Sequence, residues 1–243
     1  MRSRDRSMPE ELNRLMTDAI SDVLLTPSKD GDENLLKEGV AVERIHLVGN
    51  VMIDSLRSLE GKAERSVILE QAGVSSQNYG LVTLHRPSNV DDREVFTGIL
   101  SALDVVQKQI PLVWPLHPRT AKMIDQFGLE ERVSGMAQLR RIEPVGYLDS
   151  LKLQKHARLV LTDSGGLQEE TTAFGVPCLT MRENTERPVT ISKGTNTLVG
   201  VSFEKIVEMA ECVLEGRYKI DRIPEKWDGH TAERIVEVLD RLF

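Results

Sequence analysis

The sequence predicts an α/β protein built on a parallel sheet, because short apolar runs alternate with helical segments from residue 81 onward. The apolar runs 81–84, 111–116 and 139–142 are each followed by a stretch with helical periodicity. The clearest unit begins with the run 159–161, which leads into a glycine-rich turn, a short helix closed by Gly175 and a second apolar run. Sheets of this kind bind ligands beyond the carboxyl ends of their strands, so polar residues at those ends are the candidate site.

The chain before residue 60 predicts several helices and a single strand. An amphipathic helix is expected from residue 10 to about residue 24, where apolar residues recur at helical spacing. Ser7 is its expected N-cap, and Glu10 lies three residues later, where it completes a capping box. The remaining elements expected in this part are a helix at 32–38, a strand at 45–50 and a helix at 52–59.

The main part of the chain is expected to begin within residues 55–80, a mixed and charged stretch that carries Gly, Ser and Asn. The tail, residues 228–243, predicts one amphipathic helix. The other elements expected between them are helices at 64–72, 91–109, 119–127, 148–156, 167–173, 189–193 and 203–214, with strands at 176–181 and 196–199.

The composition is that of an ordinary globular protein, and it narrows the classes of partner. Of 243 residues, 40% are hydrophobic and 28% charged, and the formal net charge of −7 argues against a nucleic-acid-binding surface. The two cysteines form neither a metal-binding nor a disulfide pattern. Because the sequence has no apolar run of about 18 residues and no secretory signal, we expect a cytoplasmic protein without a membrane span.

The glycine-rich turn is suited to an anionic ligand. Gly165 and Gly166 would let a ligand approach the backbone closely, and the free N–H groups of the following helix attract phosphate. Glu170 lies one turn further on, where its carboxylate could accept hydrogen bonds from ribose hydroxyls, and Arg187 could grip phosphate with a guanidinium fork. The alternative is a plain strand-to-helix turn with Ser164 as helix cap and Glu170 as a solvated surface residue, which an isolated Ser-Gly-Gly favours.

The longer string around this turn is more specific than the turn alone. Residues 163–170 read DSGGLQEE and residues 182–188 read RENTERP. This pair resembles the hydrolysing and non-hydrolysing UDP-N-acetylglucosamine 2-epimerases, whose pattern is D-S-G-G-x-Q-E-E followed by R-x-x-T-E-R-P. Every fixed position of that pattern is met here. The resemblance covers essentially the whole chain, but only about the last two thirds of the family's usual length.

Histidines follow two further predicted strands. His85 and Arg86 open the string HRPSN, and His117 follows the next strand. A histidine at a strand end can donate to phosphate or move a proton near neutral pH, but each of these is explained as well by an ordinary turn. The resemblance implies a functional active-site histidine at position 85, in the family motif H-R-x-x-N, and a ligand contact at position 117. HRPSN departs at two positions from HRREN, whose residues help bind an activating second UDP-N-acetylglucosamine in some bacterial members.

The resemblance implies a GT-B-like fold, in which two Rossmann-like domains face each other across the ligand. Residues 1–55 would be a remnant of the first domain, residues 56–225 the complete UDP-binding domain, and residues 226–243 the helix that crosses back to the first domain. The family's upstream motif H-x-E-A-G, which supplies further catalytic groups, has no counterpart in this sequence. We therefore expect the chain to lack most of the N-terminal domain and to be inactive on its own.

The resemblance also implies a reaction. Family members interconvert UDP-N-acetylglucosamine and UDP-N-acetylmannosamine by eliminating UDP and adding it back after proton delivery to the opposite face of the sugar. Glu10 and His85 would be catalytic, with no metal and no cofactor. The residues expected to contact UDP or the UDP-sugar are Ser164, Gly165, Gly166, Glu170, Arg187, His117 and Arg86.

The resemblance leaves some points open. The family holds uracil with an aromatic side chain where this chain has Ser150, so Tyr147 or backbone groups would have to contact the base. A homodimer is implied for full-length members. Two alternatives remain for the function: a nucleotide-sugar-binding domain without activity, and a GT-B glycosyltransferase.

Overall fold

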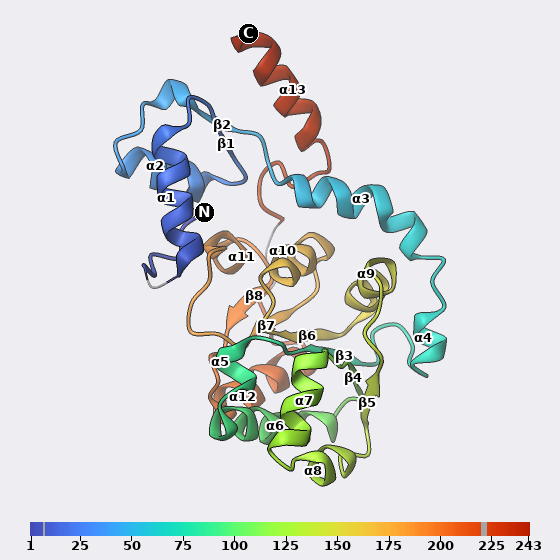
Figure 1. Cartoon of the computed structure of the whole chain (residues 1–243). Helices are drawn as coiled ribbons and strands as arrows, with labels where there is room; N and C mark the ends of the chain where they lie inside the picture. Colours follow the sequence, from blue (N-terminus) through green and yellow to red (C-terminus); the bar gives the residue numbers. More distant parts are fainter. Residues whose placement is uncertain (7, 220–222) are drawn as a thin grey trace.

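The computed structural model describes residues 1–6, 8–219 and 223–243, and these form two parallel sheets (Figure 1). The smaller sheet pairs β1 (Leu24–Thr26) with β2 (Ile45–Leu47). The strands of the larger sheet are β3 (Gly80–Thr83), β4 (Leu112–Pro115), β5 (Leu139–Ile142), β6 (Leu159–Thr162), β7 (Cys178–Thr180) and β8 (Asn196–Leu198). Their order in space is β5-β4-β3-β6-β7-β8, and every neighbouring pair is parallel.

Helices connect these strands, as the alternation in the sequence predicts, so the expected α/β class is confirmed. The first part of the chain contains α1 (Pro9–Ile20), α2 (Lys29–Lys37), the 3-10 turn η1 (Val42–Arg44), α3 (Val51–Ala63) and α4 (Ile68–Gln71). The rest contains α5 (Pro87–Val90), α6 (Arg93–Gln107), α7 (Pro118–Gln126), α8 (Glu130–Ser134), α9 (Tyr147–His156), α10 (Gly165–Phe174), α11 (Pro188–Ser192), α12 (Phe203–Leu214) and α13 (Thr231–Leu242).

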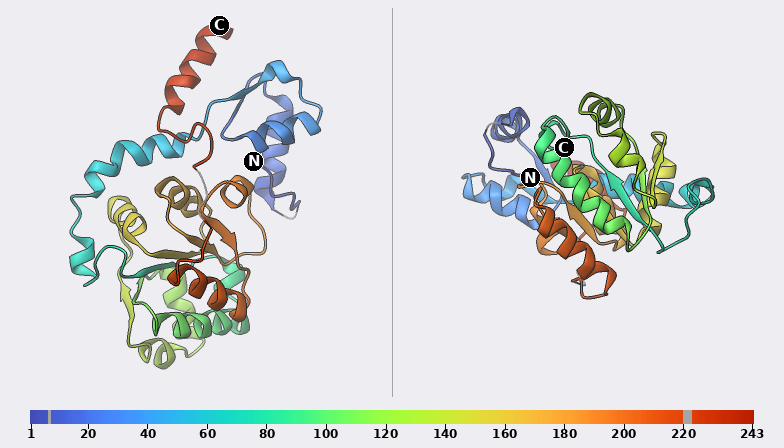
Figure 2. Two further views of the ribbon diagram at one scale, coloured as in Figure 1. Left: turned by 180° about the vertical axis from the view of Figure 1, so that it is seen from behind. Right: turned by 90° about the horizontal axis from the view of Figure 1, so that it is seen from below.

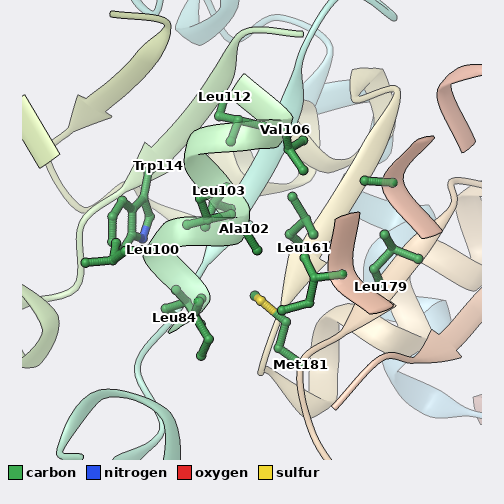
Figure 3. Close-up of a cluster of buried hydrophobic side chains, with 14 of the residues drawn as sticks. Leu84, Leu100, Ala102, Leu103, Val106, Leu112, Trp114, Leu161, Leu179 and Met181 are labelled. Atoms are coloured by element: carbon green, nitrogen blue, oxygen red, sulfur yellow. The ribbon is translucent and has the colours of Figure 1, made fainter. Parts of the chain in front are cut away.

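Helices cover both faces of the six-stranded sheet. Along β6, Leu159 and Leu161 join a core that α6 and α12 complete, whereas Val160 joins a second core with α9 on the opposite face. The first of these cores contains Trp114 and Met181, which are fully buried (Figure 3). Because a strand that is buried on both faces needs no polar face, it reads as a continuous apolar run.

The strand order places a reversal of the chain path between β3 and β6. From β3 the chain adds β4 and β5 on one side, then returns to add β6, β7 and β8 on the other side. In open parallel sheets the crevice for a ligand lies beyond the carboxyl ends of the strands at such a reversal. The segments that follow β3 and β6 are therefore the ones to examine for function.

Helix α3 joins the two parts of the molecule. It leaves the small sheet and packs across α9 and α10, on one side of the large sheet (Figures 1 and 2). Helix α13 contacts α3 and projects away from the large sheet (Figure 2). Ahead of α13, the indole N–H of Trp227 donates to the carbonyl oxygen of Pro27 at 2.9 Å, so the end of the chain is tied to the first part.

Two expectations for the first part need correction. The predicted helix from residue 10 to about residue 24 is too long, since α1 ends at Ile20 and Leu24 begins β1. Leu24 pairs with Ile45 in parallel, and this long-range pairing overrides the helical spacing of the local sequence. The helix begins at Pro9 with Met8 at the N-cap, while Ser7, the expected cap, lies outside the described residues.

The pattern also missed the short helices α5 and α8, which have too few residues for a helical period to be recognised. In the part of the chain that the structure describes, no helix is long and apolar enough to cross a membrane.

Candidate functional site

The segments after β3 and β6 meet at the reversal of the sheet. Thr83 and Thr162, the last residues of the two strands, are paired in the ladder, and their side-chain oxygens lie 2.5 Å apart. His85 and Arg86 follow β3, and the Asp-Ser-Gly-Gly turn follows β6. The structure thus brings two separately predicted motifs together at the carboxyl edge of the sheet.

Asp163 connects these two segments. Its side chain is fully buried, and its Oδ2 accepts the backbone N–H groups of His85 at 2.9 Å and Arg86 at 2.8 Å. Its Oδ1 lies 2.9 Å from Nδ1 of His85. In return, Nε of Arg86 donates to the carbonyl oxygen of Asp163 at 3.0 Å. These contacts hold His85 and Arg86 beside the glycine-rich turn.

His117 lies next to His85, with ring centroids 5.5 Å apart. It is also the N-cap of α7, because its Nδ1 accepts the backbone N–H of Arg119 at 3.1 Å. His117 therefore has a structural role as the cap of α7, which is the alternative that the sequence left open. Its ring also lies at the edge of the crevice, beside the ring of His85. His85 has no such capping role, and 40% of its side chain is exposed.

The turn itself presents open backbone to the crevice. Ser164 is the N-cap of α10 without a side-chain capping bond, and its backbone N–H donates to Oγ1 of Thr162 at 2.9 Å. A methyl group added at Gly165 would come within 2.5 Å of Nη1 of Arg187, so the guanidinium lies directly over this glycine. A methyl group at Gly166 would meet no protein atom within 4 Å. The close approach of Arg187 thus accounts for a glycine at position 165, whereas position 166 faces open space.

Arg187 is held by two carboxylates. Its Nε lies 2.8 Å from Oε2 of Glu169, and its Nη1 lies 3.3 Å from Oε2 of Glu186. Oε1 of Glu169 also accepts a hydrogen bond from Nδ2 of Asn50, the N-cap of α3. Sequence reasoning missed this support, because nothing in the string RENTERP says which acidic residue of α10 its arginine will meet.

Glu170 is not the solvated surface residue of the alternative interpretation, since only 6% of it is exposed. Its Oε1 accepts the hydroxyl of Tyr147 at 3.0 Å, and its Oε2 accepts Nε2 of Gln154 at 2.8 Å. Burial raises the pKa of Glu170, against the effect of these two hydrogen bonds. Tyr147, which we considered for contact with the base, thus bonds a residue predicted to bind ribose.

Glu10 is exposed on the first turn of α1. The buried acid of this helix is its neighbour Glu11, which accepts the backbone N–H groups of Ser3 and Arg4 and an N–H of Arg14. Burial alone would raise the pKa of Glu11, but the hydrogen bond from Arg14 and those from the backbone lower it to about 2.

A cavity of about 350 Å³ links the segment before α1 to the crevice. Asp5 and Met8 line it from one side, and Arg86, Asn89 and Arg182 line it from the other. The N-terminal segment therefore reaches the same edge of the sheet as Arg86. The position of Arg182 in this lining was not predicted, because Arg182 was recognised only as the first residue of the string RENTERP.

The chain matches known proteins over nearly its whole length. The family model for UDP-N-acetylglucosamine 2-epimerase matches residues 1–240. A UDP-N-acetylglucosamine 2-epimerase of Methanococcus maripaludis is 41% identical over 98% of this chain, and a UDP-2,3-diacetamido-2,3-dideoxy-D-glucuronate 2-epimerase of Pseudomonas aeruginosa is 39% identical over all of it. The chain spans 66% of the length of each relative.

A solved structure shows the same fold. The UDP-GlcNAc 2-epimerase of Methanocaldococcus jannaschii, in complex with UDP-GlcNAc and UDP, superimposes with a TM-score of 0.83 at 38% identity. The alignment covers 99% of this chain and 67% of that one. The GT-B-like architecture expected from the motifs is therefore confirmed for the part of the fold that is present. Together, the motifs, the sheet topology and these matches show that the chain belongs to the UDP-N-acetylglucosamine 2-epimerase family.

Proposed function

We propose that the crevice beyond β3 and β6 binds a UDP-sugar, and that the chain carries the nucleotide-binding part of a UDP-N-acetylglucosamine 2-epimerase. The observation that carries the proposal is the meeting of three diphosphate-binding features at one edge of the sheet. These are the N-terminus of α10 at Gly165 and Gly166, the guanidinium of Arg187 above it, and Arg86 beside it.

The charges at this edge favour an anion. Burial lowers the pKa of Arg86, and the positive charges of Arg182 and Arg187 add to that effect. Arg182 is paired with Glu186 and Arg187 with Glu169, whereas the guanidinium of Arg86 donates through Nε to the carbonyl oxygen of Asp163. A diphosphate would relieve the repulsion among the guanidinium groups and accept the remaining N–H groups of Arg86.

Glu170 supports the nucleoside part of the proposal. Each of its oxygens accepts one hydrogen bond within the protein, from Tyr147 or from Gln154, and retains a further lone pair. Hydroxyl groups of a ribose can donate to those lone pairs. Tyr147 is 40% exposed, so it stands at the boundary between Glu170 and solvent, where it can close over a sugar.

The reaction that fits such a site is elimination followed by re-addition. The bond between C1 and the diphosphate oxygen breaks as C2 loses its proton, which gives 2-acetamidoglucal and UDP. UDP then adds back to C1 after a proton reaches the other face of C2. We assign His85 and Glu10 as proton-transfer groups, and Arg86 and Arg187 as the groups that stabilise the charge of the departing UDP. Ser164 and His117 complete the proposed set of contacts.

The substrate class is a UDP-activated 2-acetamido sugar. This class includes the substrate named for the Pseudomonas aeruginosa relative as well as UDP-N-acetylglucosamine. Because the chain spans only 66% of these relatives, we also propose the domain division 1–55, 56–225 and 226–243, with the second part binding UDP and the last part crossing back. The second candidate function is UDP-sugar binding without turnover. It also rests on the fact that the chain spans only 66% of the length of these relatives.

Two measurements test the proposal. Titration calorimetry should detect UDP binding, and absence of any heat at millimolar UDP would contradict the assignment of the crevice. Proton NMR of the chain with UDP-N-acetylglucosamine should show no UDP-N-acetylmannosamine, because groups of the missing third are needed. Turnover would establish an epimerase in these 243 residues and refute the binding-only candidate. Transfer of the sugar to an added acceptor alcohol would instead identify a glycosyltransferase.

A further inference from the structure

The buried carboxylate of Asp163 has one oxygen that lies beside the ring of His85. Oδ2 accepts the backbone N–H groups of His85 and Arg86, and Nδ2 of Asn89 lies 3.5 Å from it. Oδ1 is also buried, and none of the hydrogen bonds of the described residues reaches it. Nδ1 of His85 lies 2.9 Å from it. A buried carboxylate oxygen without a donor is costly, so the ring nitrogen beside it must supply a proton.

We propose that Asp163 is a positioning residue that fixes His85 in the tautomer with the proton on Nδ1. At 2.9 Å from Oδ1, a lone pair on Nδ1 would be repelled by the carboxylate, whereas a proton there is attracted to it. Nε2 of His85 then carries the lone pair in the neutral ring. The His85 side chain is 40% exposed.

His117 provides an internal contrast. Its Nδ1 accepts the backbone N–H of Arg119 at 3.1 Å, so this nitrogen must carry the lone pair, and the proton of the neutral ring is on Nε2. Two neighbouring histidines, whose rings are 5.5 Å apart, are thus held in opposite tautomers by different partners. Neither assignment depends on a bound ligand.

The consequence for chemistry rests on the proposed function. With Nδ1 protonated, Nε2 of His85 can take up a proton, and the resulting N–H can donate to an oxygen of the departing diphosphate. The carboxylate of Asp163 balances the positive charge of the doubly protonated ring. If Nε2 held the proton in the neutral ring, that nitrogen would have no lone pair with which to accept one.

Replacing Asp163 with Asn should reverse the tautomer of His85. The backbone N–H groups of His85 and Arg86 still need an acceptor, so the amide oxygen takes the place of Oδ2. The amide NH₂ group then faces Nδ1 of His85, which must turn from donor to acceptor. The matched control is Asp91→Asn, which removes a carboxylate from an exposed ion pair with Arg119.

The experiment is long-range ¹H–¹⁵N NMR of the histidine rings in the unliganded chain, at a pH where they are neutral. We expect His85 with the proton on Nδ1 and His117 with the proton on Nε2 in the wild type and in Asp91→Asn, and loss of the Nδ1 tautomer of His85 in Asp163→Asn. A wild-type His85 protonated on Nε2 would overturn the inference even if the variant failed to fold. Calorimetry with UDP is scored separately, because failure to bind UDP contradicts the proposed function and leaves the tautomer result unchanged.

Discussion

At the scale of single residues, the site depends on how a few charged side chains are paired. Arg187 lies over Gly165 because Glu169 and Glu186 hold it there, and Glu169 is in turn bonded to Asn50 of the neighbouring element. Each carboxylate fixes the guanidinium while leaving N–H groups of the fork for a ligand. The position of Arg187 is therefore set by contacts within the protein.

Removing the guanidinium should weaken nucleotide binding without unfolding the chain. Arg187→Ala loses hydrogen bonds to a charged ligand, which are worth roughly 1.5–3 kcal/mol, or about 10- to 100-fold in the dissociation constant for UDP. Titration calorimetry measures the change. Arg217→Ala serves as the control, because Arg217 forms an exposed ion pair with Glu215 away from the crevice. Equal affinities for the wild type and Arg187→Ala would remove Arg187 from the site.

The two glycines of the turn allow a paired test. Gly165→Ala should displace the Arg187 guanidinium, because the new methyl group would lie 2.5 Å from Nη1. In Gly166→Ala the new methyl group meets no neighbouring atom within 4 Å, so the free energy of unfolding should stay within about 0.5 kcal/mol of the wild-type value. We expect both variants to bind UDP more weakly, the first through Arg187 and the second through direct contact with the ligand. If Gly166→Ala binds UDP normally, the diphosphate does not approach the backbone at this point.

At the scale of elements, ion pairs join the end of α3 to α9 beside the large sheet. Glu64, just after α3, pairs with Lys152, Lys155 and His156 of α9. The hydrogen bond from Lys155 lowers the pKa of Glu64 most, burial opposes it, and Lys152 and His156 lower it further, to about 2 from an ordinary 4.5. Glu64 thus fastens α3, the helix that joins the two parts of the molecule, to α9 beside the large sheet.

This pairing predicts a pH dependence of stability. A carboxyl group with a lowered pKa in the folded state stabilises the fold above its unfolded pKa and loses that effect as the pH falls through its folded value. Glu64→Gln should therefore cost about 1 kcal/mol near neutral pH, a modest figure because 35% of the side chain is exposed to screening solvent. The difference from the wild type should shrink between pH 5 and pH 2 in urea denaturation. A difference independent of pH would contradict the ion-pair explanation, and Glu131→Gln, at an exposed position of α8, is the control.

The buried strand β6 gives a second prediction at this scale. Leu161 is fully buried between helices of the first core, so Leu161→Ala should reduce the free energy of unfolding by about 2–5 kcal/mol. Leu148→Ala, at a position that is 37% exposed, should cost much less. Urea denaturation of the two variants measures both values. Similar losses would mean that β6 is not the central support of the sheet.

At the scale of the whole molecule, the sequence predicts the large sheet well and the first part less well. Regular alternation of apolar runs and helical stretches is a local signal, and it located each strand from β3 to β8. The pairing of Leu24 with Ile45 is a long-range event, so helical spacing alone extended α1 through β1. The motif contains Asp163 and Glu169 without giving them a role, and it predicted ribose binding for Glu170. Only the fold revealed that the partners of these three residues are His85, Arg187 and Tyr147.

The first and last helices of the molecule expose apolar side chains. Several side chains of α1 and α13 are exposed, including Met16 at 61%, Ile20 at 84% and Val236 at 56%. Exposed apolar faces of this kind favour association with other apolar surfaces.

The most direct test of the central claim is a crystal structure of the chain with UDP. Our account predicts the diphosphate against the backbone N–H groups of Gly165 and Gly166, in contact with Arg187 and Arg86, and the ribose hydroxyls on Glu170. A nucleotide seated elsewhere on the molecule, with this crevice occupied only by solvent, would contradict it.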